Sequence, residues 1–247
     1  MINKELILKK CKKLLYAYRN WLLGDVSMPE DAHPIFIDNE TRLVYFTLPM
    51  SLNYQRNSFG LRNSVLISYN DIVTRDVFDI WISANLTDED LRVKLLKHKI
   101  ALQPNKHINT RSRISKTIYE NRWSIWWLLE ACEYDFLKLQ ELVQKKHKKW
   151  FPYLSGPKIF HYWCFILWEY CDILLKNTSY IQIAPDTHVM QSSVKLWVLS
   201  QEEIDTFSRD AISQRWREVL ADTGTDPIHM HSPLRFWSRS GFEYDIK

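Results

Sequence analysis

The sequence is short of glycine, of cysteine pairs and of long apolar runs. The four cysteines are scattered and form no CxxC pair, which argues against a disulfide framework, a zinc site or an iron–sulfur cluster. No apolar run approaches the roughly 20 residues that a membrane-spanning helix needs, and the N-terminal stretch lacks the continuous apolar segment of a signal peptide. We therefore expect reduced, packed thiols and a cytoplasmic protein.

Glycine is scarce while tryptophan is abundant. The chain of 247 residues has only 5 glycines, where ordinary usage of about 7% predicts roughly 17. It has 11 tryptophans, and some stand where glycine is typical, such as Trp150 at the start of a turn and Trp123 in ENRWSIWW. Two explanations stay open at this point. Either a stop codon that the source organism decodes as glycine is translated here as tryptophan, or the protein has an aromatic-rich core.

The overall composition is that of a globular protein. Hydrophobic residues make up 46% and charged residues 25%, which excludes wholesale disorder and suits one or two domains with a real core. The net charge of +4 permits a polyanionic partner without demonstrating one. His229 and His231 form an isolated HxH, which is too few ligands for a metal site, so we expect no metal and no cofactor.

The periodicity of the apolar residues predicts a mostly α protein with one small β element and no internal repeat. The β element is expected at residues 34–49, where β-branched and aromatic residues flank Asp38–Asn39 and suggest a short hairpin or crossover. Ser51 is expected to cap the following helix, and Asp135 a later one. Helices are predicted over 2–23, 71–83, 88–102, 110–121, 124–132 and most of the chain after Trp150.

Two segments carry residues suited to catalysis. In FPYLSGPKIFHYWCFILWEY, Gly156–Pro157 makes a tight turn, and Lys158 lies in the first turn of the helix that follows. In IQIAPDTHVMQSSVKLWV, Asp186 occupies the N-cap position of a helix that starts at Thr187.

Simple geometry predicts that Lys158 and Asp186 lie close together. A helix from 158 to about 175 is about 26 Å long, and the ten residues 176–185 span up to about 33 Å when extended, so the chain can return to the start of that helix. The positive ends of helices oppose an ammonium group and favour a neutral, nucleophilic amine. The same amide-rich ends can also receive DNA phosphates.

The turn–Lys–helix followed by Asp-Thr-His-Val resembles the helix-hairpin-helix DNA glycosylase superfamily, the relatives of endonuclease III. The family hairpin reads Leu-Pro-Gly-Val-Gly-x-Lys, of which Gly156 and Lys158 match here, with Leu154 at the place of the first glycine. The resemblance implies a two-lobed helical fold over residues 1–247, with the helix-hairpin-helix at about 136–175. It also implies that Lys158 is the nucleophile and Asp186 the assisting carboxylate.

Among these glycosylases the chain is most similar to the archaeal 8-oxoguanine subgroup, which has this size and a Tyr-Gln helix segment, here Tyr54–Gln55. In that subgroup a glutamine and a C-terminal acid and tryptophan form the base pocket. Gln55 matches the glutamine. His231 stands at the place of the acid and Arg235 at that of the aromatic residue, with Trp237 two positions further on. The expected base pocket is therefore Gln55, His231 and Trp237.

The resemblance implies a monomer that binds double-stranded DNA with a damaged base, flips the base out and releases it through a lysine Schiff base with AP-lyase activity. Gly156, Lys148, Lys149 and His188 are the expected contacts to DNA. The protein is expected to avoid membranes and to associate with the nucleoid when bound to DNA.

Ordinary structural roles also fit these residues. Lys158 and the run Lys145–Lys149 can form a solvated surface, Asp186 can be a plain helix cap, and Gln55 a surface residue. Two other functions are therefore carried forward: a DNA-binding protein that keeps the hairpin but lacks the chemistry, and an all-α scaffold with no nucleic-acid role.

Overall fold

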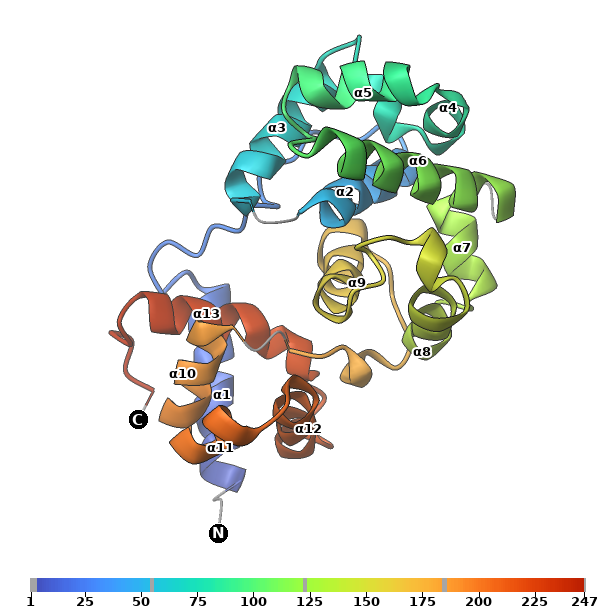
Figure 1. Ribbon diagram of the computed structural model, residues 1–247. Helices are drawn as coiled ribbons and strands as arrows, with labels where there is room; N and C mark the ends of the chain where they lie inside the picture. The colour runs from blue at the N-terminus through green and yellow to red at the C-terminus, as the bar shows by residue number, and fades with distance from the viewer. Residues whose placement is uncertain (1–3, 54–55, 122–123, 184–185, 247) are drawn as a thin grey trace. The chain divides into compact units, whose positions relative to one another are not determined.

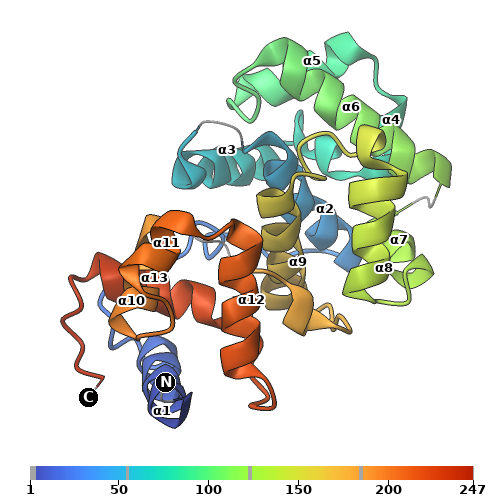
Figure 2. The same ribbon diagram turned by 60° about the horizontal axis from the view of Figure 1, so that its bottom comes forward.

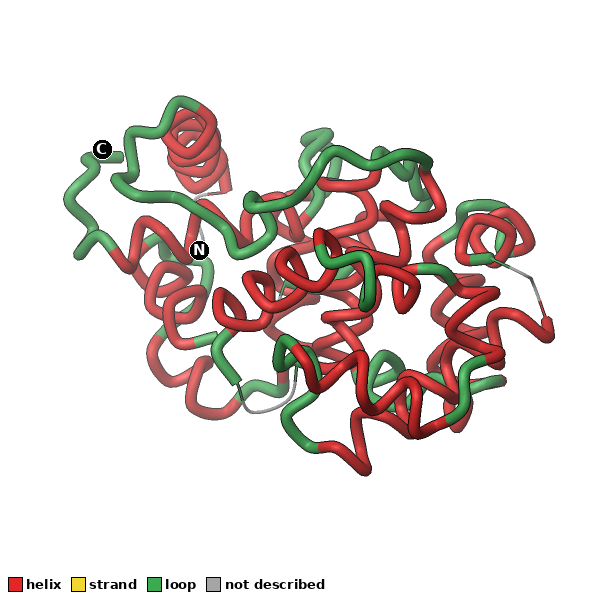
Figure 3. The backbone as a smooth tube through the Cα atoms, turned by 90° about the horizontal axis from the view of Figure 1, so that it is seen from above, coloured by secondary structure: helices red, strands yellow, loops and turns green. Residues whose placement is uncertain are grey.

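The computed structural model describes residues 4–53, 56–121, 124–183 and 186–246. The described residues form helices joined by turns and loops (Figures 1 and 3). Over these ranges the one β feature is an isolated parallel bridge between Asp135 and Lys176, so the mostly α prediction is confirmed. None of the helices described is long and apolar enough to cross a membrane.

The chain folds into two compact units. Unit 1 combines the two ends of the chain, Met1–Ser27 and Asn177–Lys247, and unit 2 is the continuous segment Met28–Lys176. Each unit is described below by itself.

Unit 2 is built around a central helix, α2, which packs against α6, α7 and α9 (Figure 2). Residues 43–52 of α2 are all buried. The α-helices of unit 2 are α2 (Asn39–Leu52), α3 (Ser58–Asn70), α4 (Ile80–Asn85), α5 (Asp88–Lys97), α6 (Pro104–Asn121), α7 (Ile125–Ala131), α8 (Phe136–Gln140) and α9 (Pro157–Cys171). Short 3-10 turns cover Arg75–Phe78 and Lys148–Trp150, and a π-helical turn covers Glu141–Lys146.

The prediction of a small β element at 34–49 is wrong, because most of that segment belongs to α2. Asp38 caps the helix by accepting the Thr41 amide at 2.8 Å. The helix is buried on every side over its last ten residues, so its sequence lacks the polar face that reveals a helix by its period. Ser51 lies inside α2 and does not cap the next helix. Asn57 caps α3 instead, accepting the Gly60 amide at 3.0 Å.

Unit 1 is a bundle in which the N-terminal helix packs against helices from the end of the chain. α13 packs against α10 and α1, and α1 also contacts α12 (Figure 1). The α-helices of unit 1 are α1 (Lys4–Arg19), α10 (Thr187–Lys195), α11 (Gln201–Thr206), α12 (Arg209–Leu220) and α13 (His231–Arg239). Short 3-10 turns cover Thr178–Tyr180 and Pro227–Met230.

All four cysteines are buried as free thiols, as the scattered spacing predicted. Burial raises the pKa of the Cys11 thiol to about 12 and that of Cys171 to about 12. These side chains are therefore neutral packing groups, because the thiolate is the reactive form.

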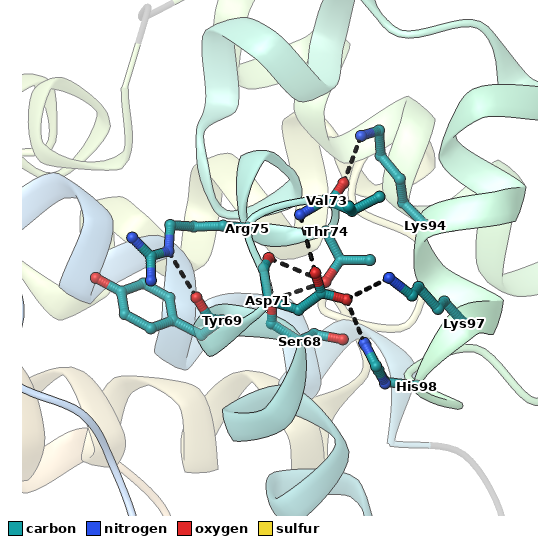
Figure 4. Close-up of polar contacts among 9 residues, drawn as sticks. All are labelled: Ser68, Tyr69, Asp71, Val73, Thr74, Arg75, Lys94, Lys97 and His98. Atoms are coloured by element: carbon teal, nitrogen blue, oxygen red, sulfur yellow. Dashed lines mark hydrogen bonds and ion pairs between the residues drawn. The ribbon is translucent and has the colours of Figure 1, made fainter.

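A charged cluster ties the end of α3 to α5 (Figure 4). Asp71 Oδ2 lies 2.6 Å from both Lys97 Nζ and His98 Nε2, and Oδ1 accepts the Val73 amide at 2.9 Å. The Lys94 ammonium donates to the Val73 carbonyl at 2.7 Å. The hydrogen bonds from Lys97 and His98 hold the pKa of the Asp71 carboxyl well below its usual range.

Candidate active site

Lys158 lies in the first turn of α9, directly after the turn that the sequence predicted. Gly156 is the N-cap residue and Pro157 the first residue of the helix, a position that suits proline because its missing amide hydrogen has no helical acceptor there. The Lys158 side chain is exposed. Its ammonium has no hydrogen-bond or ion-pair partner in the part of the chain that the structure describes, so it is available to a ligand.

Gly156 suits this turn because of a close approach and not because of an unusual backbone angle. Its φ is −64°, an angle that any residue adopts. Its amide donates to the Tyr153 carbonyl at 2.9 Å, and a Cβ at this position would lie 3.0 Å from the same oxygen. Gln144 fixes the turn from the preceding helix by donating to the Ser155 carbonyl at 3.1 Å.

A buried aromatic contact links α8, before this turn, to α9, after it. Phe136 at the start of α8 contacts Phe160 of α9 with ring centroids 5.7 Å apart, and both side chains are fully buried. α9 ends at Cys171, and Asp172 follows with a left-handed φ of 57°, so the helix is shorter than predicted. A helix–turn–helix thus covers 136–171. That it is the helix-hairpin-helix of the glycosylases stays a prediction.

The lysines before the turn form an exposed cationic stretch. Lys148 and Lys149 lie in the 3-10 turn that precedes Phe151, and both are exposed. Within the described ranges neither has a carboxylate partner, whereas Lys145 is paired with Glu141 at 2.8 Å. The unpaired charge beside the turn therefore comes from Lys148 and Lys149.

Asp186 caps α10 in unit 1, as predicted. Its Oδ1 accepts the Val189 amide at 2.9 Å. Its Oδ2 lies 3.9 Å from Nε of Arg235 on α13, and both side chains are part-buried. Among the described residues Arg235 Nε is buried without a hydrogen-bond partner. The resemblance placed Arg235 where the family has an aromatic residue and gave it no role, so its contact with Asp186 is a finding of the structure.

His188 is turned towards α13. Its Nδ1 lies 3.1 Å from Ser238 Oγ, and that hydroxyl donates to Gln191 Oε1 at 2.7 Å. Because the hydroxyl proton is given to Gln191, His188 donates from Nδ1. The ring is half-buried, so Nε2 is the atom left to contact a ligand.

The predicted base-pocket residues are core residues where they are described. His231 begins α13 and is 3% exposed, and Trp237 is 1% exposed. Trp237 Nε1 donates to the Tyr244 carbonyl at 3.0 Å, and its ring meets Phe242 edge to face. Gln55 lies outside the described residues.

Trp237 also lines a cavity of about 890 Å³ within unit 1, which the sequence did not reveal. Lys10 of α1 lines the same cavity and is only 9% exposed. Its ammonium lies 3.7 Å from the ring centroid of Trp197. A lysine on the apolar face of α1, between Ile7 and Leu14, was the available sequence signal.

Lys158 belongs to unit 2 and Asp186 to unit 1, so their expected proximity stays a prediction. The chemistry on offer is an exposed primary amine at the start of one helix and a capping carboxylate at the start of another. Across the described ranges, no group of three or more His, Cys, Asp and Glu side chains gathers to hold a metal ion. Comparisons of the chain with protein families, curated proteins and solved structures found no match.

Proposed function

We propose that the protein is a DNA glycosylase with AP-lyase activity that acts on a damaged base in duplex DNA. The observation that carries this proposal is the exposed Lys158 ammonium, which has no partner among the described residues and directly follows the Gly156–Pro157 turn. A lysine that is not paired with a carboxylate is free to reach a substrate, and its amine is a nucleophile once it has lost its proton.

In the proposed reaction the Lys158 amine attacks C1′ of the damaged nucleotide. A C1′–N bond forms, the glycosidic bond breaks, and the base leaves with the bonding electrons and takes up a proton. Asp186 stabilises the positive charge that develops on the sugar. Loss of the amine proton and opening of the sugar ring give an imine, and removal of a C2′ proton then breaks the C3′–O bond.

DNA binding is proposed to come from the cationic stretch before the turn. Lys148 and Lys149 are exposed and unpaired within the described ranges, and helix starts such as that of α9 can receive phosphates. His188 can add a phosphate contact through Nε2 when its ring carries a proton on both nitrogens, because the Nδ1 hydrogen is already donated to Ser238. Because phosphate contacts release counterions, binding should weaken steeply with salt, by roughly 0.9 log units per tenfold rise in salt for each contact.

The proposed substrate is an oxidised purine such as 8-oxoguanine, read by a pocket that includes Gln55, His231 and Trp237. This part rests on the sequence resemblance alone. Gln55→Ala should reduce excision of the base while leaving cleavage of a preformed abasic site intact. Equal loss of both activities would assign Gln55 to folding.

Reductive trapping tests the nucleophile. Borohydride reduces an imine to a stable amine, so the wild-type protein with a duplex carrying a damaged base or an abasic site should give a covalent protein–DNA band. Lys158→Gln should lose that band and still bind DNA. Lys116→Gln, which removes another exposed lysine of unit 2, should keep the band.

Asp186→Asn separates the carboxylate's charge from its capping role, because asparagine caps helices as well as aspartate does. This variant should bind DNA and release base slowly. Trapping that persists in Lys158→Gln would assign the nucleophile to another lysine. Salt-dependent DNA binding without trapping on any lesion would replace the proposal with a binding-only protein, and absence of DNA binding would favour a scaffold role.

A further inference from the structure

Two helices of unit 1 end on an exposed tryptophan in the left-handed conformation. Trp21 follows α1 with a φ of 59°, and Trp197 follows α10 with a φ of 63°. The Trp21 amide donates to the Tyr18 carbonyl at 3.2 Å, and the next amide, of Leu22, donates to Ala17 at 2.8 Å. This pair of bonds defines a Schellman motif, with Trp21 at the position just after the cap.

α10 ends in the same way. The Trp197 amide donates to the Val194 carbonyl at 2.9 Å, and the Val198 amide donates to Ser193 at 2.9 Å. Glycine is the usual residue at this position, because a Cβ there is crowded by the backbone whereas glycine adopts a positive φ freely.

The end of α13 shows the expected residue in the same motif. Gly241 has a φ of 70°, its amide donates to the Ser238 carbonyl at 3.0 Å, and the Phe242 amide donates to Trp237 at 2.9 Å. Three helices of unit 1 thus end in one motif, which holds glycine in one case and tryptophan in two. In unit 2 the same pair of bonds closes α7 with Glu133 at a φ of 56°, so the positive φ alone does not identify a glycine position, and the large exposed indole is what sets Trp21 and Trp197 apart.

The side chains of Trp21 and Trp197 contribute little packing. They are 67% and 61% exposed, and in the part of the chain described neither indole N–H has a hydrogen-bond partner. The Lys10 ammonium lies over the Trp197 ring, which also lines the cavity described above. An exposed indole gains little from burial, so packing does not explain the choice of tryptophan at either turn.

Other tryptophans of the chain are of a different kind. Trp163, Trp216 and Trp237 are at most 1% exposed. Their indole N–H groups donate to Thr47 Oγ1 at 2.8 Å, Ser193 Oγ at 3.0 Å and the Tyr244 carbonyl at 3.0 Å, respectively. A buried, hydrogen-bonded indole is what a core tryptophan requires.

We infer that glycine is the natural residue at positions 21 and 197, each encoded by a UGA codon that the source organism reads as glycine and that is written here as tryptophan. Trp163, Trp216 and Trp237 are genuine tryptophans encoded by UGG. Recoding at these two positions accounts for part of the shortage of glycine and of the surplus of tryptophan in the composition. The inference does not extend to Trp150, which lies in a 3-10 turn without a positive φ, nor to Trp123, which lies outside the described residues.

The codons of the gene test this inference directly. We expect UGA at positions 21 and 197 and UGG at 163, 216 and 237. UGG at position 21 or 197 would overturn the inference for that position. UGA at any of the three buried positions would overturn the distinction between recoded glycines at exposed turns and genuine tryptophans in the core.

Thermal unfolding of the purified protein provides a second test, which needs no knowledge of the gene. Trp21→Gly and Trp197→Gly should each raise the Tm, by about 2–4 °C for a chain of this size. Trp197→Ala should gain less than Trp197→Gly, because alanine keeps the Cβ that opposes a positive φ. Trp81→Gly is the matched control, since Trp81 is 58% exposed but lies within α4, and glycine there should lower the Tm. Equal effects of alanine and glycine at 197 would assign any gain to removal of the indole and would count against the inference.

Discussion

Asp186 and Arg235 join the start of α10 to the middle of α13: one carboxylate oxygen caps the helix through the Val189 amide, and the other lies 3.9 Å from the Arg235 guanidinium. The Asp186 carboxylate therefore has a structural role that is independent of any catalytic role. Substitution can separate its helix-capping role from its interaction with Arg235.

Asp186→Ala should lower the free energy of unfolding by about 1 kcal/mol, the usual cost of losing an N-cap, whereas Asp186→Asn should change it little. Urea unfolding of the two variants measures the difference. If the asparagine variant loses as much stability as the alanine variant, the interaction with Arg235 outweighs the cap.

Gly156→Ala should destabilise the turn before α9, because the new Cβ would meet the Tyr153 carbonyl at 3.0 Å and forced contacts of this kind cost about 1–3 kcal/mol. Gly60→Ala is the control. A Cβ at Gly60 has its nearest neighbour at 3.9 Å within α3, so alanine should stabilise that helix by up to about 1 kcal/mol. Loss of stability in both variants would show that the turn at 156 is not specially constrained.

The buried pair of Arg62 and Glu30 should be sensitive to removal of one partner alone. Arg62 Nη2 lies 2.9 Å from Glu30 Oε1, with both side chains at most 3% exposed, and Tyr162 donates to the other carboxylate oxygen at 3.1 Å. Arg62→Met leaves a buried charge unpaired and should cost about 3–5 kcal/mol. The double variant Arg62→Met, Glu30→Gln should recover part of this loss, and a strictly additive double variant would mean that the two side chains are not coupled.

Asp71 should make unit 2 sensitive to acid. The pKa of its carboxyl is lowered in the folded protein by the hydrogen bonds from Lys97 and His98, whereas in the unfolded chain it is near the ordinary value of about 3.9. The unfolded state therefore takes up the proton first. The stabilisation is fully present above about pH 4 and is lost as the pH falls towards the folded-state pKa.

Asp71→Asn tests this directly. The variant should be less stable than the wild type at pH 7, and the difference in the free energy of unfolding should shrink as the pH is lowered below about 4. A difference that stays constant down to pH 2 would show that the titration of Asp71 does not contribute.

Local signals in the sequence were sufficient for the starts of α8 and α10 and for the turn that carries Lys158. Asp135 and Asp186 both cap helices as predicted, Asp135 by accepting the Leu137 amide at 2.8 Å and the Lys138 amide at 3.1 Å. Capping depends on three or four consecutive residues, so the sequence contains all that is needed.

Features that depend on distant packing could not be predicted. α2 has no polar face over residues 43–52, because other helices of unit 2 cover it on all sides, and its β-branched and aromatic residues were therefore interpreted as strand. The Asp186–Arg235 contact joins residues of two helices that only the fold brings together. The placement of Lys158 relative to Asp186 depends on two units, and trapping with both variants is the test of their joint role.

The discontinuous make-up of unit 1 has a consequence for folding during synthesis. α1 is made before unit 2, but α12 and α13, its packing partners, are made after it. Closing an unfolded intervening loop of roughly 150 residues costs on the order of 4 kcal/mol in chain entropy, whereas unit 2 is continuous and can form without waiting. Folding is therefore expected to proceed from the middle of the chain outwards. Until α12 and α13 have been made, the apolar face of α1, which includes Ile7, Cys11 and Leu14, lacks these packing partners and is open to chaperones.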